Sequence, residues 1–150
     1  MPSRRFLKVL IMGLPGSGKT TLAADLQRRI SIDYKSFWLN ADVIRKQFND
    51  WDFSEVGRDR QAKRMKELAD LHGKYNDVVI CDFVCPLEKT RREFNADYLV
   101  YVNTIKESIY ADTNKIFECP VKFNFEVKHK NSDHYSRIIG DELVRELRKI

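Results

Sequence analysis

Residues 13–20 read GLPGSGKT, a complete G-x-x-x-x-G-K-[ST] phosphate-binding loop. The glycines let the backbone curl so that several N–H groups point at phosphate oxygens, next to the positive end of the following helix. The amine of Lys19 is expected to reach the β- and γ-phosphates, and the hydroxyl of Thr20 to bind Mg²⁺. The motif therefore predicts that the chain binds a nucleoside triphosphate, ATP, together with Mg²⁺. The expected contacts are the loop and the residue after it: Gly13, Leu14, Pro15, Gly16, Ser17, Gly18, Lys19, Thr20 and Thr21.

A strand before the loop and a helix after it are the context in which this motif is meaningful. The apolar run over residues 6–12 predicts the strand, and the spacing of apolar residues over 18–30 predicts the helix. The alternative, a glycine-rich turn that binds nothing, explains neither the full-length pattern nor its position directly after a strand.

Short apolar runs alternate with helical patterns along the whole chain. Strands are predicted over residues 6–12, 36–39, 78–84, 98–102 and 121–127. Helices are predicted over residues 18–30, 41–49, 54–74, 87–94, 104–111 and 133–149, the last with Ser132 or Asp133 as its cap. This alternation predicts an α/β, three-layer P-loop NTPase fold with a mostly parallel five-stranded sheet flanked by helices, in a single domain over residues 1–150.

Residues that directly follow the strands are the candidates for chemistry, because ligands of such sheets bind at the carboxyl ends of the strands. Asp42 and Arg45 follow the second strand, three positions apart at the start of a helix, and are predicted to share the face over the sheet. The carboxylate of Asp42 would orient or deprotonate an acceptor hydroxyl, and Arg45 would hold an anionic substrate. The structural alternatives are a helix cap for Asp42 and a solvated charge for Arg45.

Asp82 lies near the end of the apolar strand 78–84 and is a second candidate. A carboxylate in this place holds Mg²⁺, through water, in phosphate-loop enzymes. A structural role, in which Asp82 accepts hydrogen bonds from backbone amides, is equally compatible with the sequence.

The net charge of +5 arises in the first 30 residues, where six cations (Arg4, Arg5, Lys8, Lys19, Arg28 and Arg29) face Asp25 alone. A nucleic-acid-binding face usually spreads over several elements with stacking aromatic residues between the charges. The local excess therefore favours a small anionic substrate, and nucleic acid is not the expected partner. No apolar stretch is long enough to span a membrane, and three cysteines without metal-ligand spacing favour a reduced, cytoplasmic protein.

Five segments carry a more specific pattern: GLPGSGKTTLA at 13–23, NADVIR at 40–45, FSEVGRDRQAKRM at 53–65, VVICDFVCP at 78–86 and KTRREF at 89–94. Together they resemble the adenylylsulfate kinase (APS kinase) family. The resemblance implies ATP-dependent phosphorylation of the 3′-hydroxyl of adenylyl sulfate, a nucleotide-like anion, and a homodimer. It places the acceptor site at Asp42, Arg45, Phe53, Arg58, Gln61, Val84, Cys85 and Arg91, with Arg64 matching a later helix arginine.

Within that resemblance, Phe53 matches the aromatic residue that stacks on the adenine, and Arg58 matches the arginine that grips the sulfate–phosphate end. Such roles suit the residues themselves, because a purine offers a π-face and an anhydride offers anionic oxygens. The structural alternative for Phe53 is a hydrophobic staple that packs against the helix beginning at Ser54.

The chain also departs from the family pattern at several positions. Asn40 and Ala41 replace Asp and Gly, and Gly57, Gln61 and Thr90 replace Asp, Asn and Asp. The lid region contains no arginine between residues 92 and 137, so that Lys115 is the expected cation for the transferred phosphoryl group, alongside Lys19 and Asp42 as catalytic residues. Two alternatives stay open: a kinase for another hydroxyl (nucleoside, polynucleotide 5′-end, sugar or polyol), and a nucleotide-binding protein with little turnover.

Overall fold

Five strands in the described residues, 5–150, form one sheet in the order β2-β3-β1-β4-β5, and each neighbouring pair is parallel. The computed structural model leaves residues 1–4 outside the description, so Arg4 of the basic N-terminal segment is not placed. The strands are β1 (Leu7–Met12), β2 (Ser36–Asn40), β3 (Val78–Asp82), β4 (Tyr98–Val102) and β5 (Phe125–Val127). The helices are α1 (Lys19–Ile30), α2 (Ala41–Phe48), α3 (Glu55–Gly73), α4 (Glu88–Phe94), α5 (Ala111–Ile116) and α6 (Ser132–Leu147).

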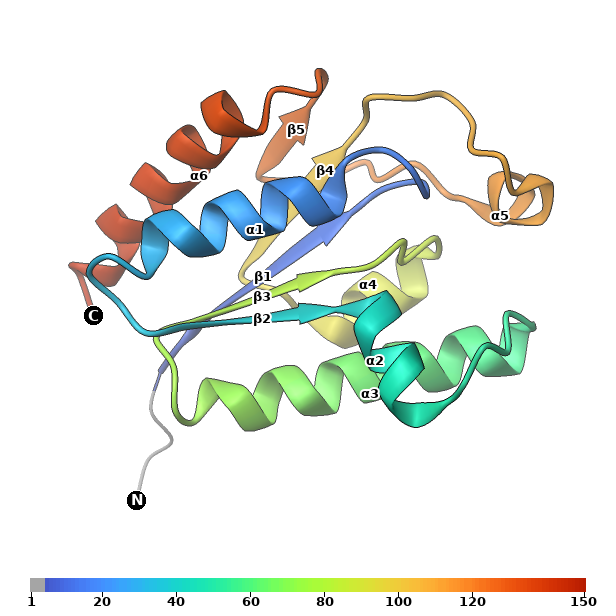
Figure 1. Cartoon of the computed structure of the whole chain (residues 1–150), viewed down its shortest axis with the longest axis horizontal. Helices are drawn as coiled ribbons and strands as arrows, with labels where there is room; N and C mark the ends of the chain where they lie inside the picture. The colour runs from blue at the N-terminus through green and yellow to red at the C-terminus, as the bar shows by residue number, and fades with distance from the viewer. Residues whose placement is uncertain (1–4) are drawn as a thin grey trace.

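Helices cover both faces of the sheet, which gives the three predicted layers (Figure 1). On one face, alternate strand residues pack against α1 and α6 in a core that includes Val9, Leu26 and Leu143. On the other face, the intervening strand residues pack against α2, α3 and α4, with Met65 and Phe94 at the centre. Strands buried on both sides explain the almost continuous apolar runs in the sequence.

Side-chain caps fix where several helices begin. The side chain of Asn40 accepts a hydrogen bond from the backbone N–H of Val43 at the start of α2, and Ser54 does the same for Gly57 in α3. The cap of α6 is Asn131, which accepts from the N–H of His134, so the prediction of Ser132 or Asp133 was wrong by one or two positions. Among residues 5–150, no helix is long and apolar enough to cross a bilayer.

The predicted helix over residues 104–111 was wrong. Residues 104–110 form a loop, and the short helix α5 begins only at Ala111. The side chains of Ser108 and Asn114 explain the difference, because they bond to backbone groups that a helix would use. Asn114 accepts from the N–H of Ser108 at 2.8 Å and donates to the carbonyl of the same residue at 2.8 Å.

The last strand is shorter than the predicted 121–127. Strand β5 begins at Phe125. At Asn124 the side chain, in place of a backbone carbonyl, accepts the hydrogen bond from the N–H of Leu99 in β4, at 2.8 Å. The carboxyl ends of all five strands described meet at one edge, where the phosphate-binding loop, α2 and the segments after β3, β4 and β5 converge (Figure 1). This edge is where a ligand of a parallel sheet binds.

We expect Leu26→Ala to lower the free energy of unfolding by about 2 to 5 kcal/mol, because Leu26 of α1 is fully buried in the core that α1 and α6 form on the sheet. Chemical denaturation followed by circular dichroism measures this change. Ile32→Ala is the matched control, since Ile32 is 80% exposed in the turn after α1 and should shift the midpoint little. An equal loss in both variants would contradict the packing described here.

Candidate active site

The phosphate-binding loop has the curled backbone that its glycines predict. Gly16 and Gly18 have φ angles of 82° and 105°, in the left-handed region that side-chain-bearing residues seldom adopt. The N–H of Ser17 donates to the carbonyl of Leu14 at 3.2 Å, which closes the turn before α1. Helix α1 therefore starts at the loop with its free N–H groups directed to one point, a geometry suited to an anion.

Lys19 extends back along the loop, and its amine donates to the carbonyl of Leu14 at 2.9 Å. Its side chain is buried at the carboxyl edge of the sheet. Burial lowers the pKa of Lys19 to about 8, although the neighbouring carboxylates of Asp82 and Asp42 act in the opposite direction. A partly dehydrated cation at this position gains from a phosphate group, which would replace the carbonyl as its partner.

Ser17 supplies a direct observation on ligand fit. Its hydroxyl oxygen is fully buried and has no hydrogen-bond partner among the described residues. It lies inside the loop, 3.1 Å from the position that a Cβ on Gly13 would take. A buried hydroxyl without a partner costs free energy, so the loop fits a ligand that brings an oxygen acceptor, as a triphosphate does.

Asp82 ends β3 inside a group of polar side chains from β2 and from the first turn of α1. Its carboxylate accepts hydrogen bonds from the indole N–H of Trp38 at 2.6 Å, the hydroxyl of Thr20 at 3.1 Å and the amide of Asn40 at 3.1 and 3.2 Å. Burial raises the pKa of Asp82, and these hydrogen bonds oppose the rise. No backbone amide is among these donors, whereas the structural role considered from the sequence was that Asp82 accepts hydrogen bonds from backbone amides.

The oxygen atoms of Thr20 and Asp82 fit a Mg²⁺ ion. Mg²⁺ prefers hard oxygen ligands and is commonly held by one or two protein groups, with phosphate oxygens and water completing its shell. Residues 5–150 contain no cluster of three or more histidine, cysteine or acidic residues that could hold a metal by themselves. The pair is therefore suited to an ion that arrives with a triphosphate.

A cavity of about 110 Å³ lies next to the phosphate-binding loop, between α1 and the segment that joins β5 to α6. Thr104 and Lys130 line it and also contact the loop directly. The hydroxyl of Thr104 donates to the carbonyl of Ser17 at 2.6 Å, and the amine of Lys130 donates to the carbonyl of Gly16 at 3.0 Å. These residues were missed in the sequence, although both follow the ends of strands, the positions at which ligands are expected.

Asp42 and Arg45 lie three positions apart in α2 and differ in burial, although Asp42 is near enough to Arg45 to oppose the lowering of its pKa by burial. Asp42 is exposed in the first turn, near enough to Lys19 to influence its pKa. Arg45 is only 5% exposed and donates to the carbonyls of Asp50 and Asp52 at 2.9 and 3.2 Å. Its guanidinium lies beneath the ring of Phe53, 4.2 Å from the ring centre. Arg45 thus stabilises the segment that follows α2.

Phe53 and Arg58 lie together at the start of α3. The ring of Phe53 is 51% exposed, although one face is covered by Arg45. Arg58 donates from Nε to the carbonyl of Phe53 at 2.8 Å and from Nη2 to the hydroxyl of Thr113 at 3.1 Å. The carboxylate of Asp112 is 3.7 Å from the same guanidinium, so Arg58 joins α3 to α5.

Gln61 and Arg91, two further predicted substrate residues, make contacts within the protein. Gln61 is buried and donates to the carbonyl of Ala41 at 3.0 Å, which ties α3 to the start of α2. Arg91 is buried and donates to the carbonyls of Cys85, Pro86 and Glu118. Both side chains hold the walls of the site in place.

The turn after β3 is backbone-strained where the acceptor side chains were predicted. Cys85 has a φ of 46°, a left-handed value that is rare for residues other than glycine, and its carbonyl is held by Arg91. The Cys85 thiol is buried and its pKa is raised to about 12 by burial, which makes it a poor nucleophile. Val84, just before it, is half-buried, and Lys115 is exposed in the last turn of α5.

A parallel sheet of this order, with a phosphate-binding loop after its central strand and the polar side chains of Thr20 and Asp82 at the carboxyl edge, is the fold of P-loop kinases. The chain belongs to the adenylylsulphate kinase family, whose model matches residues 5–119. The matched part includes the phosphate-binding loop, Asp82 and the Phe53–Arg58 segment.

Two relatives illustrate the extent of the similarity. A probable adenylyl-sulfate kinase of Aeropyrum pernix is 35% identical over 147 residues, which cover 91% of this chain and 80% of that protein. The adenylyl-sulfate kinase of Penicillium chrysogenum is 35% identical over 92 residues, 59% of this chain and 44% of that protein. The chain spans about half the length of several curated relatives that it matches.

Solved structures share the fold. The Mycobacterium tuberculosis APS kinase, solved in complex with AMPPNP and APS, is 18% identical and superposes with a TM-score of 0.79 over 96% of this chain and 99% of that one. A gluconokinase from Sinorhizobium meliloti is 15% identical, with a TM-score of 0.64 over 97% of each chain. The fold is therefore common to kinases of different acceptors.

We expect nucleotide affinity to fall as the pH rises above about 8, because Lys19 then loses the proton that attracts phosphate. Below that pH the amine is charged and the affinity should be nearly constant. Above it, the Kd of a non-hydrolysable ATP analogue should rise up to about tenfold per pH unit, measured by calorimetry. Lys19→Met should bind more weakly and show no such rise, whereas a flat profile for the unaltered protein would contradict the assignment.

Proposed function

We propose that this chain is an ATP-dependent kinase that phosphorylates the 3′-hydroxyl of adenylyl sulfate. The observation that carries the proposal is the pairing of two sites at one edge of the sheet, in a chain of the adenylylsulphate kinase family. The phosphate-binding loop with Lys19 forms the donor site, and Phe53 with Arg58 forms the acceptor site. The relatives' names support this choice of acceptor.

The donor site would hold the triphosphate of ATP along Gly13–Thr21. Lys19 and the N–H groups at the start of α1 would bind the β- and γ-phosphates, and Ser17 would donate its unpartnered hydroxyl. The cavity beside Thr104 and Lys130 is placed for the nucleoside part of ATP. Thr20 and Asp82 would hold Mg²⁺, which neutralises charge on the phosphate oxygens when bound.

The acceptor site would take adenylyl sulfate by stacking and charge. The open face of Phe53 suits the adenine, and Arg58 suits the sulfate–phosphate anhydride. Gln61, Val84 and Cys85 would shape this site mainly through backbone position, since the amide of Gln61 is occupied by an internal hydrogen bond. Arg91 binds carbonyls through Nε and Nη2, while its buried Nη1 has no hydrogen-bond partner among the described residues. Arg45 would act from beneath the ring of Phe53.

In the transfer step, the 3′-oxygen attacks the γ-phosphorus and the bond to the bridging oxygen of ADP breaks, with the electron pair leaving on ADP. Asp42, exposed at the start of α2, would orient the hydroxyl and accept its proton. Lys19 would stabilise the charge that develops on the phosphoryl oxygens, and Lys115 would approach from α5. The proposed setting is cytoplasmic, in keeping with three free cysteines, and a homodimer is the proposed assembly.

ADP release with Mg-ATP tests the proposal directly. We expect strong stimulation by adenylyl sulfate and none by adenosine, AMP, gluconate or a 5′-hydroxyl oligonucleotide. Asp42→Asn should lower kcat by about a hundredfold or more while leaving the Kd for the ATP analogue within about twofold, because general-base loss affects the transfer step. Asp33→Asn is the control, because Asp33 is exposed in the turn before β2, at the amino ends of the strands.

Stimulation by one of the other acceptors would refute adenylyl sulfate as the substrate and keep the donor chemistry. Slow ATP hydrolysis with every acceptor would instead indicate a nucleotide-binding protein with little turnover.

Asp82→Asn tests the metal ligand. Loss of the carboxylate charge should raise the Mg²⁺ concentration for half-maximal ADP release by about tenfold, because the amide is a weaker ligand for a hard cation. Trp38 and Asn40 still meet an oxygen in this variant, so the thermal midpoint should move little. An unchanged Mg²⁺ requirement would remove Asp82 from the metal site.

A further inference from the structure

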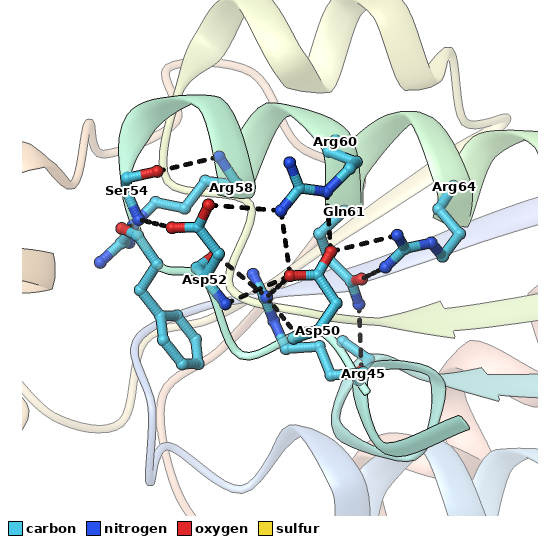
Figure 2. Close-up of polar contacts among 11 residues, drawn as sticks. Arg45, Asp50, Asp52, Ser54, Arg58, Arg60, Gln61 and Arg64 are labelled. Carbon is cyan, nitrogen blue, oxygen red and sulfur yellow. Dashed lines mark hydrogen bonds and ion pairs between the residues drawn. The ribbon is translucent and has the colours of Figure 1, made fainter. Parts of the chain in front are cut away.

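The segment between α2 and α3, residues 50–54, is held by charged side chains from both helices (Figure 2). We call it the 50–54 loop. At its start, the carboxylate of Asp50 accepts two hydrogen bonds from Arg60, at 2.8 and 3.0 Å, and one from Arg64 at 3.1 Å. The side chain of Asp50 is only 11% exposed. A carboxylate bound by two guanidinium groups fixes the beginning of the loop on α3.

Arg60 also reaches the second carboxylate of the loop. Its Nη2 lies 3.3 Å from Oδ2 of Asp52, so one guanidinium bridges Asp50 and Asp52 (Figure 2). The other oxygen of Asp52 accepts from the N–H of Ser54 at 2.9 Å, next to the first turn of α3. Arg60 therefore connects the start of the loop to its middle, and no role was predicted for it from the sequence.

Arg45 holds the same loop from the side of α2. It donates to the carbonyls of Asp50 and Asp52, and it supports the ring of Phe53 from below. The loop thus has guanidinium partners on both of its flanks.

Gly57 explains how the loop packs so closely on α3. A Cβ at this position would lie 2.2 Å from the carbonyl oxygen of Asp52 and 2.5 Å from its carboxylate carbon. Any side chain at residue 57 would displace the loop. The family pattern has an aspartate here, and in this chain the carboxylate of Asp52 occupies the space beside Gly57.

The charges of this arrangement persist over a wide pH range. The hydrogen bonds from Arg60 hold the pKa of Asp50 well below its usual range. The hydrogen bonds from Ser54 lower the pKa of Asp52, and Arg60 contributes in the same direction. The loop therefore stays clamped wherever the protein is folded near neutral pH.

We propose that Arg60 and Gly57 are positioning residues that hold the 50–54 loop preformed, with Phe53 and Arg58 in place for a purine nucleotide acceptor. The proposal rests on the proposed function. The carbonyl of Phe53 is bonded to Nε of Arg58, so a shift of the loop moves the stacking ring and the anion-binding guanidinium together. A preformed loop avoids the free energy of ordering it when the acceptor binds. Arg60 acts through Asp50 and Asp52 and has no direct contact with the acceptor.

Steady-state kinetics of Arg60→Ala and Gly57→Ala test the effect on the acceptor. We expect the KM for adenylyl sulfate to rise by about tenfold in both variants, and the KM for ATP to stay within about twofold. Arg60→Lys keeps the charge and loses the two-pronged contact, so its KM should resemble that of Arg60→Ala. Lys63→Ala, one turn further along α3 and paired with Asp59, is the control and should match the unaltered enzyme.

Hydrogen exchange of the 50–54 loop tests its position without any substrate. In the intact protein the N–H groups of Asp50, Asp52 and Ser54 are hydrogen-bonded, and they should exchange faster in Arg60→Ala and Gly57→Ala. Exchange in the phosphate-binding loop should stay the same. Unchanged exchange, or an Arg60→Lys variant with the KM of the unaltered enzyme, would overturn the proposal. Absence of turnover with adenylyl sulfate in the unaltered protein would refute the proposed function alone, since the exchange result does not depend on it.

Discussion

The structure of the proposed donor site depends on one buried lysine, Lys19, whose ammonium group is largely dehydrated. Lys19 is buried at the carboxyl edge of the sheet, where a cation is stable only beside oxygen atoms. The carbonyl of Leu14 supplies one oxygen, and the negative charges of Asp82 and Asp42 lie near enough to oppose the effect of burial on its pKa. Those carboxylates come from the end of β3 and from the first turn of α2, which follows β2, so the strand order brings both of them near the buried lysine.

In the proposed acceptor site the charges are reversed, since the buried ion is a carboxylate and its partners are cations. Here a buried carboxylate, Asp50, is surrounded by guanidinium groups from α2 and α3. The result is a fixed loop with two exposed aromatic residues, Trp51 and Phe53, and a guanidinium, Arg58, just beyond its end. The two halves of the proposed site are thus built around different buried ions, Lys19 and Asp50, and Asp42 lies near enough to Lys19 and Arg45 to act on the pKa of each.

The sequence predicted most of the strands and helices and the backbone of the phosphate-binding loop, because that information is local. The residue types and spacing of the phosphate-binding loop determine its backbone, and the apolar run over 98–102 matches β4 residue for residue. The helix expected over 104–111 failed because the side chain of Asn114 bonds to the backbone and the hydroxyl of Ser108, which a count of apolar positions does not detect.

The acceptor half was harder to predict because the direction of a long side chain depends on distant carbonyl groups. Arg45 and Arg91 occupy positions that match the family pattern, yet both turn inward to backbone oxygens of neighbouring loops. Asp50 lies in no recognised motif and no function was predicted for it, although it is at the centre of the charged cluster. Its partners, Arg60 and Arg64, are separated from it by 10 and 14 residues, and only the close approach of α2 and α3 brings them together.

The internal contacts of these arginines limit how much ion pairing can contribute to recognition of the proposed acceptor. Arg45 and Arg91 bind backbone carbonyls, so fewer cations are free to bind the proposed acceptor than the sequence predicts. Arg58 also donates one of its hydrogen bonds to Thr113. Direct ion pairing then contributes less to recognition than the placement of a stacking surface. For the proposed adenylyl sulfate acceptor, the position of the loop that carries Phe53 is therefore the feature of the site on which binding depends most.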